Sequence, residues 1–293
     1  MFVVTLLSAR QDPRVSRTLA EATADEIGEA ETVWLEHDVA CDLVTREKPS
    51  AATMERLRRL ALDESVDCVV QEAEGRRKRI LLADMDSTMI DEECIDELAA
   101  AIGIKDQVAA ITARAMNGEI AFEPALRERV ALLRDLPVST IADVIAHHIT
   151  LADGGSTLVR TMNANGAHTA LVSGGFTAFT TVIAEKLGFA ENRANVLNVS
   201  GDRLSGTVAE PILGAEAKLA ALREIAGRLG VTPDQAIAVG DGANDLPMIL
   251  AAGTGVAIHA KPAVAAKAPH RIDHGDLTAL LFIQGYRAGE FVG

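Results

Sequence analysis

Two aspartates separated by one residue, Asp84 and Asp86, follow directly after the apolar run Ile80 to Ala83. Such a run predicts a buried strand, so both carboxylates are expected at its carboxyl end. Like charges repel and burial favours the neutral acids, so this placement needs a chemical reason. The pair is a weak signal by itself, because Asp and Ser are also common at strand-end turns and helix N-caps.

A calcium-binding loop is one alternative for this segment, and the residues exclude it. Counting twelve positions from Asp84, position six is Met89 where such a loop has glycine, and position twelve is Ile95 where it has glutamate. A sugar-transferase metal motif is a second alternative, and no nucleotide-binding signature accompanies it.

Polar residues also follow two further apolar runs. Ser173, Gly174 and Gly175 end one run and offer a hydroxyl and backbone N–H groups, which suit an anion. A second run ends in a segment with Asp241, Asn244 and Asp245, and Lys218 lies in a predicted helix between the two runs. In open α/β sheets ligands bind outside the carboxyl ends of the strands, so these residues predict one active site.

The elements that must position these residues form an α/β pattern. Nearly continuous apolar runs near residues 80–83, 168–175, 235–242 and 253–259 predict parallel strands covered on both faces. Residues 91–155 show helical periodicity and are placed to form a lid over the site. The segment 194–211 alternates and turns at Gly201-Asp202, which predicts a hairpin.

The first 76 residues predict a separate small α/β unit with the order βαββαβ, a ferredoxin-like arrangement. Its expected elements are a strand at 2–8, a helix at 12–28 with Pro13 at its start, two strands within 31–45, a helix at 50–65 with Ser50 as N-cap, and a strand at 66–74. The basic run "GRRKR", 75–79, is interpreted as a solvated linker. The expected division is therefore 1–76 and 78–293, the latter with a core of 78–90 and 156–293 and a cap of 91–155.

Composition narrows the function further. The formal net charge of −14 argues against nucleic acid or an anionic membrane as partner, since both need basic surface. Three scattered cysteines without C-x-x-C spacing argue against a disulfide framework or a zinc site and favour the reducing cytoplasm. No stretch approaches the roughly 18 apolar residues of a membrane span, so we expect a soluble protein.

The segments "DMDSTMIDEECI", "LVSGGF" and "GDGANDLPMI", together with Lys218, resemble the four motifs of the haloacid-dehalogenase superfamily of phosphotransferases. Within that superfamily, "ARAMNGEI" and "FEPALRERV" resemble the phosphoserine phosphatases. The resemblance covers residues 78–293. It implies a Rossmann-like core with an inserted helical cap, and hydrolysis of O-phosphoserine, the last step of serine biosynthesis, through an aspartyl-phosphate.

The resemblance also implies roles for individual residues. Asp84 is the nucleophile, Asp86 the general acid and base, and Lys218 a catalytic and phosphate-binding cation. Mg²⁺ is the implied cofactor, with the side chains of Asp84 and Asp241 and the main-chain carbonyl of Asp86 as ligands, while Asp245 supports Lys218 or a metal-bound water. The implied substrate-binding residues are Glu93 for the ammonium, Arg129 for the carboxylate, Met116 and Phe122 as shields of the closed site, and Ser173, Gly174, Lys218 and Asn244 around the phosphate.

Several alternatives stay open at this point. The nearest is a related phosphatase or phosphotransferase acting on another small phosphomonoester. A receiver-type signalling domain also combines Asp, Lys and Mg²⁺, but it lacks a cap such as 91–155, and a catalytically dead serine sensor would not keep every catalytic position filled. The N-terminal unit resembles an ACT-like domain only in element order, so amino-acid binding, a structural role and homodimer formation are all compatible with it.

Overall fold

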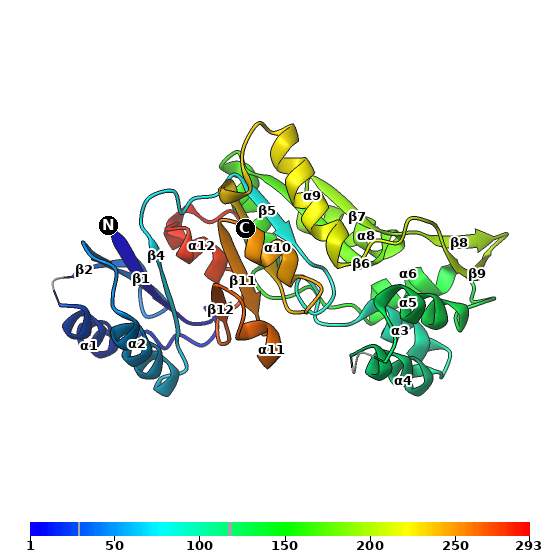
Figure 1. Ribbon diagram of the computed structural model, residues 1–293, viewed down its shortest axis with the longest axis horizontal. Coiled ribbons are helices and arrows are strands. Elements are labelled where there is room, and N and C mark those ends of the chain that lie inside the picture. Colours follow the sequence, from blue (N-terminus) through cyan, green and yellow to red (C-terminus); the bar gives the residue numbers. More distant parts are fainter. Residues whose placement is uncertain (29, 117–118) are drawn as a thin grey trace.

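The structure is a computed structural model that describes the whole chain except residues 29 and 117–118. An antiparallel sheet, a parallel sheet and a group of helices follow one another along the long axis of the molecule (Figure 1). The chain passes through them in sequence order, except that it leaves the parallel sheet after its first strand and returns to it after the helical group.

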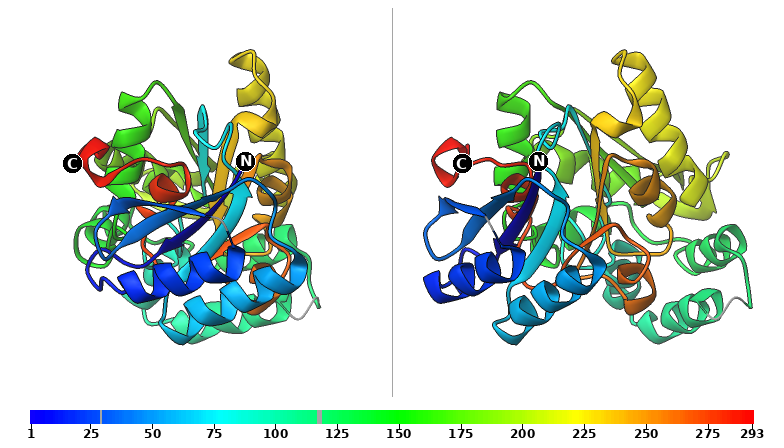
Figure 2. Two further views of the ribbon diagram at one scale, coloured as in Figure 1. Left: turned by 90° about the vertical axis from the view of Figure 1, so that its left-hand side faces the viewer. Right: turned by 60° about the vertical axis from the view of Figure 1, so that its left-hand side comes forward.

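The antiparallel sheet confirms the predicted βαββαβ order. Its elements are β1 (Phe2–Leu7), α1 (Arg17–Ile27), β2 (Glu31–Glu36), β3 (Ala40–Thr45), α2 (Ala51–Asp63) and β4 (Asp67–Glu72). The strands lie in the order β2-β3-β1-β4, and α1 and α2 lie side by side on one face (Figure 2). Ser50 caps α2 as predicted, because its hydroxyl accepts a hydrogen bond from the Thr53 N–H.

The prediction that the first helix begins at Pro13 is wrong. Helix α1 begins at Arg17, and Ser16 is its N-cap, with its hydroxyl accepting a hydrogen bond from the Leu19 N–H. A serine side chain satisfies one of the free N–H groups of the first turn, which proline cannot do. Residues 13–15 instead connect β1 to the helix, and Val15 is buried there.

Both faces of the antiparallel sheet are buried. Val4 and Leu6 of β1 pack in one cluster with Leu57 of α2. Leu7 points to the opposite face and belongs to the main hydrophobic cluster, which includes Leu280 of the parallel-sheet region. Because neighbouring strand residues point to opposite faces, this burial explains why β1 is an unbroken apolar run.

The parallel sheet has six strands in the order β12-β11-β10-β5-β6-β7. They are β5 (Ile80–Ala83), β6 (His168–Phe176), β7 (Glu191–Asn195), β10 (Ala236–Gly240), β11 (Thr254–Ile258) and β12 (His270–Ile272). Residues of α9 (Ala215–Arg228) and α10 (Leu246–Ala251) pack on one face, and residues of α7 (Gly155–Ala164), α8 (Thr177–Leu187) and α12 (Ala279–Ile283) share the main cluster with the other. This three-layer α/β core is the predicted fold class.

The insert between β5 and β6 is helical, as predicted. It contains α3 (Cys94–Ala101), α4 (Lys105–Met116), α5 (Phe122–Ala131) and α6 (Ser139–His147), which form a cap beside the core (Figure 1). The two chain segments that join cap and core are paired, since the Asp91 N–H donates to the Thr150 carbonyl over 3.1 Å.

The predicted hairpin is also present, and it lies against the cap. It is formed by β8 (Leu197–Ser200) and β9 (Arg203–Val208). The backbone N–H groups of Asp135 and Val138 donate to the carbonyls of Leu204 and Asp202, at 2.9 and 2.8 Å.

The prediction that 75–79 is a solvated linker holds for Gly75, Arg77 and Arg79, which are exposed, but it is wrong for Arg76. Arg76 keeps only 18% of its side chain exposed and forms a 2.7 Å ion pair with the buried Asp42 of β3. Arg77 pairs with Glu290 at 2.7 Å and lies over the ring of Tyr286. The segment therefore joins the two sheets, although the domain boundary between residues 76 and 78 remains a prediction.

No helix in the described part of the chain has the length and apolar character needed to cross a membrane.

Candidate active site

The sheet order brings the predicted site residues to one edge. Strand β5 lies between β10 and β6, and all three run parallel. Asp84 follows β5, Asp241 follows β10, and Ser173 lies near the end of β6. The carboxyl ends of neighbouring parallel strands meet at the same edge, so three residues distant in the sequence come together.

A buried lysine joins two of the carboxylates. Lys218 projects from α9, and its Nζ lies 2.6 Å from Oδ1 of Asp84 and 2.6 Å from Oδ1 of Asp245. Burial works against the charge on Lys218, but the two carboxylates outweigh it and hold the pKa of the ammonium at about 12. Lys218 is therefore a fixed positive charge beside Asp84.

Asp245 reaches this position because the chain has glycine at the end of β10. A Cβ at Gly240 would lie 2.3 Å from the Asp245 carboxyl carbon, so a side chain there would displace it. The second Asp245 oxygen accepts a hydrogen bond of 3.0 Å from the Gly242 N–H. Both carboxylate oxygens thus have partners, which fits the predicted supporting role.

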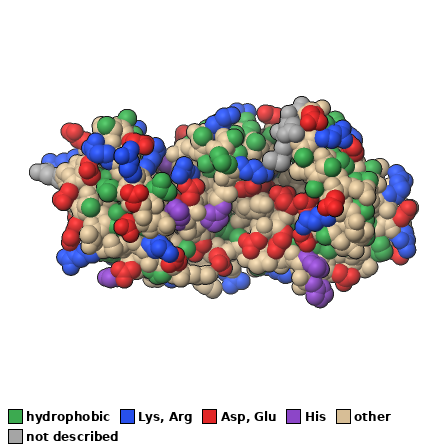
Figure 3. Space-filling view, turned by 90° about the horizontal axis from the view of Figure 1, so that it is seen from below, with side chains coloured by type: hydrophobic (Ala, Val, Ile, Leu, Met, Phe, Trp, Pro, Cys, Tyr) green, Lys and Arg blue, Asp and Glu red, His purple; other side chains and the backbone are tan. Residues whose placement is uncertain are grey.

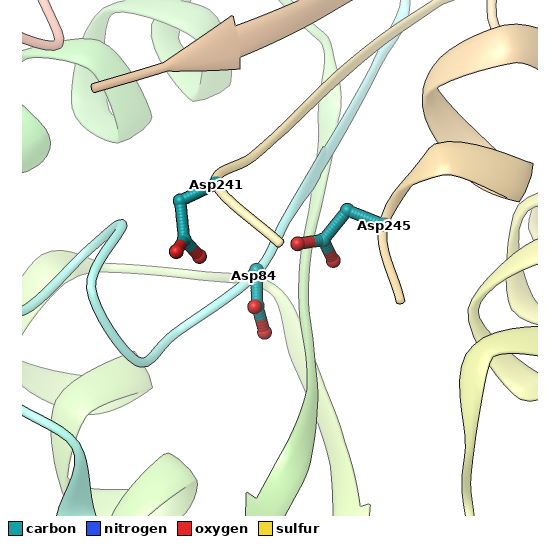
Figure 4. A group of neighbouring side chains, drawn as sticks. All are labelled: Asp84, Asp241 and Asp245. Carbon is teal, nitrogen blue, oxygen red and sulfur yellow. The ribbon is translucent and has the colours of Figure 1, made fainter. Parts of the chain in front are cut away.

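Asp84, Asp241 and Asp245 each place a carboxylate oxygen within 4.8 Å of one another (Figure 4). Burial first, and then the negative charges of Asp84 and Glu93, raise the pKa of Asp241 to about 6. Burial followed by Asp84 raises the pKa of Asp245 to about 7. The site therefore holds more negative charge than Lys218 neutralises, and the donor set of carboxylate oxygens suits a hard divalent cation.

The Asp86 side chain lies apart from this cluster and turns toward the cap. Its Oδ1 is 3.4 Å from the N–H of Cys94, in the first turn of α3, and a Cβ at Gly175 would lie 3.0 Å from its Oδ2. Ser87 adopts φ 53°, a left-handed conformation that reverses the chain immediately after Asp86. Burial, followed by Glu93 and Asp84, raises the pKa of Asp86 to about 8. This shift favours the protonated form of Asp86.

The Ser173 to Gly175 segment forms a compact turn next to Asp86. The Ser173 hydroxyl accepts a 2.8 Å hydrogen bond from the Gly175 N–H. The Gly174 carbonyl accepts one of 2.8 Å from the side chain of Asn195, which is buried and also bonds both the carbonyl and the N–H of Leu213. Sequence reasoning missed Asn195, although an asparagine ending an otherwise half-buried strand is a usable signal.

The cap presents the predicted substrate-recognition residues to this edge. Glu93 precedes α3 and accepts a hydrogen bond of 3.2 Å from the Ser87 hydroxyl. Arg129 is half-buried on α5. Burial lowers its pKa, and the carboxylates of Asp96, Glu93 and Asp86 act in the opposite direction.

Phe122 lies over the glycine backbone of the core. A Cβ at either Gly174 or Gly214 would be 3.4 Å from its ring, so this aromatic side chain from the cap covers one wall of the site. The prediction for Met116 concerns a side chain that lies outside the described part of the structure, which places only its backbone at the end of α4.

Two further residues flank the acidic cluster. Asn244 lies in the loop between β10 and α10, where its Oδ1 would be 2.3 Å from a Cβ at Gly242, consistent with its predicted place near the phosphate. Lys261 was not predicted, although it follows β11 at the same sheet edge. Its charge lowers the pKa of both Glu93 and Asp241, where burial has the larger and opposite effect.

From below, Asp and Glu side chains gather along the depression between the central part and the right-hand lobe, which is the cap (Figure 3). The structure therefore brings together the predicted residues of the core and cap. These are Asp84, Asp86, Glu93, Phe122, Arg129, Ser173, Gly174, Lys218, Asp241, Asn244 and Asp245.

Known proteins match this chain in both sequence and fold. Residues 78–253 match the haloacid dehalogenase-like hydrolase family. A phosphoserine phosphatase from Polaromonas is 45% identical over 208 residues, covering 69% of this chain and 88% of the relative. A phosphoserine phosphatase from Archaeoglobus fulgidus is 40% identical over 236 residues, covering 80% of this chain and 68% of the relative.

A solved structure matches nearly the whole chain, including the antiparallel sheet. It is a haloacid dehalogenase family hydrolase from Salmonella enterica serovar Typhi with a TM-score of 0.86 and 29% identity, and the match covers 97% of this chain and 98% of that one. The sequence match over more than half of the chain and the shared fold agree with the carboxylate and lysine cluster described above. The chain belongs to the haloacid dehalogenase-like hydrolases.

Proposed function

We propose that this protein is a phosphoserine phosphatase, which hydrolyses O-phosphoserine to serine and phosphate as the last step of serine biosynthesis. The observation that carries the proposal is the Asp84–Lys218–Asp245 cluster at the ends of β5 and β10, facing a cap with one acidic and one basic residue, Glu93 and Arg129. The curated relatives named phosphoserine phosphatase support the substrate.

The first chemical step uses Asp84 as nucleophile. Its carboxylate oxygen attacks phosphorus in line with the serine oxygen, so that an Asp84 O–P bond forms and the ester P–O bond breaks. Lys218 is fixed beside this oxygen at 2.6 Å and stabilises the charge that develops on the phosphoryl group. In this proposal Ser173, the Gly174 N–H and Asn244 hold the other phosphoryl oxygens.

Asp86 supplies the proton that the leaving serine needs. Its pKa of about 8 keeps it protonated at neutral pH, so it donates its proton to the serine oxygen as the ester bond breaks. In the second step the resulting carboxylate takes a proton from water, the water oxygen attacks phosphorus, and Asp84 leaves as a free carboxylate. Asp86 ends protonated, and the cycle balances.

We infer that the cofactor is Mg²⁺. The free carboxylate oxygens of Asp84 and Asp241, together with the main-chain carbonyl of Asp86, are the groups that would hold it, while Asp245 already has partners for both oxygens. When bound, the ion offsets the repulsion between the carboxylates and the phosphate and polarises the phosphoryl group.

The cap selects the substrate in this proposal. Glu93 binds the ammonium of phosphoserine, and Arg129 binds its carboxylate, for which a guanidinium offers two parallel N–H donors. Phe122 excludes water on the side of Gly174. A phosphoester that lacks the amino-acid part loses these contacts but keeps the catalytic cluster.

A phosphate-release assay across a panel of small phosphoesters tests this function. O-phosphoserine should give the highest kcat/KM, and removal of divalent metal with EDTA should abolish turnover until Mg²⁺ is restored. A higher kcat/KM for another phosphomonoester would contradict the assigned substrate and favour a related phosphatase of the same family. Full activity in EDTA would contradict the assigned cofactor.

A further inference from the structure

A second cavity lies between the two sheets. Its volume is about 680 Å³, and it is bounded on one side by α2 and β4 and on the other by α11 (Pro262–Ala265) and β12. None of the residues assigned above to the phosphatase reaction lines it. A volume of this size accommodates a small metabolite.

The cavity carries uncompensated positive charge. Lys48, Arg58 and Arg59 line it, and none of them forms an ion pair within the described residues. Arg56, on the same helix, is paired with Glu26 of α1 instead. Figure 3 shows Lys and Arg side chains on the left-hand lobe, beside histidines at its junction with the central part. The group formed by Lys48, Arg58 and Arg59 thus contrasts with the net charge of −14 of the whole chain.

The carboxylates around the cavity are mostly engaged elsewhere. Asp67 accepts hydrogen bonds from the N–H groups of Asp273, His274 and Gly275, at 2.8, 3.0 and 2.7 Å. Asp273 also pairs with Arg271 at 2.7 Å. Among the carboxylates that line the cavity in the described residues, only Glu55 has neither an ion pair nor a hydrogen bond. Within the described residues, three cations without an ion pair therefore face two carboxylates without one, Glu55 and Asp67.

The deeper wall offers neutral polar groups. Burial, followed by the charges of Arg58 and Lys78, lowers the pKa of His270 to about 4, so its imidazole is neutral at pH 7. Burial raises the pKa of the Cys68 thiol to about 12, against the opposing charge of Arg58. Arg58, Cys68 and His270 all line the cavity, so the charge of Arg58 acts on both neutral groups.

One buried polar atom beside the cavity lacks a partner. Within the described residues, Nε2 of His274 has no hydrogen bond although it is inaccessible to solvent. His274 lines this cavity and also a smaller one of about 230 Å³ that reaches Ser87 and Thr88, next to the catalytic Asp86. An unsatisfied buried donor or acceptor is costly, and a ligand can relieve that cost.

We propose that this cavity binds a small polyanion with phosphate or carboxylate groups, held by Arg58 and Arg59. Guanidinium groups bind both kinds of oxyanion through paired N–H donors, and Lys48 adds a third positive charge. The ligand would contact the antiparallel sheet through α2 and the core through β12, so its binding stabilises their association.

Titration calorimetry on the full-length protein with Mg²⁺ present tests the site, using inorganic phosphate and malonate as separate probes. Phosphate also binds as reaction product, so we expect two phosphate sites in the wild type and one in the Arg58→Ala/Arg59→Ala variant. If the site accepts carboxylates, malonate should bind the wild type once and this variant roughly tenfold or more weakly. The matched control, Arg56→Ala, should bind both probes like the wild type.

The two probes separate the ligand classes. A second phosphate site without malonate binding identifies a phosphorylated ligand, and the reverse identifies a carboxylate. The double variant should keep its phosphatase activity, because neither arginine belongs to the catalytic cluster. The proposal is overturned if neither probe binds outside the catalytic site, or if both bind the double variant as tightly as the wild type.

Discussion

The catalytic cleft and the cavity between the sheets are opposite in charge. In the cleft, Asp84 and Asp245 both contact one buried lysine, Lys218. Burial and neighbouring carboxylates raise the pKa values of Asp86, Asp241 and Asp245, which reflects the excess of negative charge. In the cavity the unpaired charges are mainly positive. Each region holds like charges together because the surrounding fold fixes them. The proposed ligands, a cation in the cleft and an anion in the cavity, would each supply the opposite charge.

The largest effect is expected for the residue at the centre of the cleft. Asp84→Asn keeps the size and shape of the side chain but removes the nucleophile, so kcat should fall roughly 10⁴-fold or more. Steady-state kinetics measures the loss, and circular dichroism with a thermal melt checks that the variant is folded. A variant that is folded and retains a substantial fraction of wild-type activity would mean that the carboxylate is not the nucleophile.

Arg129→Ala separates substrate recognition from phosphate chemistry. Breaking a desolvated contact between the guanidinium and the substrate carboxylate costs about 2–5 kcal/mol, so kcat/KM for phosphoserine should fall tens to thousands of fold. Hydrolysis of p-nitrophenyl phosphate, which has no amino-acid part, should change little.

Arg114→Ala is the matched control on the neighbouring helix, because Arg114 is exposed and pairs with Glu128. Its kinetics on both substrates should stay near wild type. Equal losses on both substrates in Arg129→Ala would show that this arginine supports the fold or the phosphate and does not select the amino acid.

The catalytic cleft and the region between the sheets also differ in how well the sequence predicts them. The cleft was predictable because Asp84, Ser173 and Asp241 each follow an apolar run of the sequence, and parallel strands align their carboxyl ends. Lys218 could be assigned to the site only through the family resemblance, because no sequence pattern in its helix marks it as a functional lysine. Lys261 was not predicted because the fourth apolar run lacks the aspartate or serine-glycine signal that ends the other three.

The region between the sheets could not be predicted in this way. The ion pair of Arg76 depends on Asp42, and the hydrogen bonds of Asp67 depend on N–H groups more than 200 residues away in the sequence. Such partners are fixed only by tertiary packing and cannot be seen in the sequence. A basic run such as 75–79, judged by its composition alone, is therefore interpreted as a solvated linker. The predicted helix start at Pro13 was wrong for a local reason, because Ser16 is the better N-cap.

Asp67 tests how firmly the two sheets are joined. Asp67→Ala removes the acceptor of three backbone N–H groups and should lower the free energy of unfolding by about 2–4 kcal/mol. Urea denaturation measures this change, with Asp63→Ala at the exposed end of α2 as control. A loss no larger than that of the control would show that the carboxylate does not hold the two parts together.

The smallest expected effect is the pH dependence that His270 contributes. Its pKa falls from 6.5 to about 4 on folding, so between these values the unfolded chain binds a proton that the folded chain does not. This contribution to stability is complete above pH 6.5 and is lost as the pH falls toward 4, by about 1–3 kcal/mol. The free energy of unfolding of His270→Asn should therefore fall less than that of the wild type between pH 6.5 and 4, by that amount. Identical pH profiles for the two proteins would contradict the assignment.

The most direct test of the central claim, covalent catalysis by Asp84 with Asp86 as acid and base, uses the Asp86→Asn variant and p-nitrophenyl phosphate. Nitrophenolate leaves without a proton, so the first step should proceed, whereas hydrolysis lacks its base and the aspartyl-phosphate should accumulate. Mass spectrometry of the acid-quenched, proteolysed protein should then find one phosphoryl group on the peptide that contains Asp84, and none in an Asp84→Asn/Asp86→Asn variant. Nitrophenol release without this adduct, or an adduct on another residue, would contradict the account.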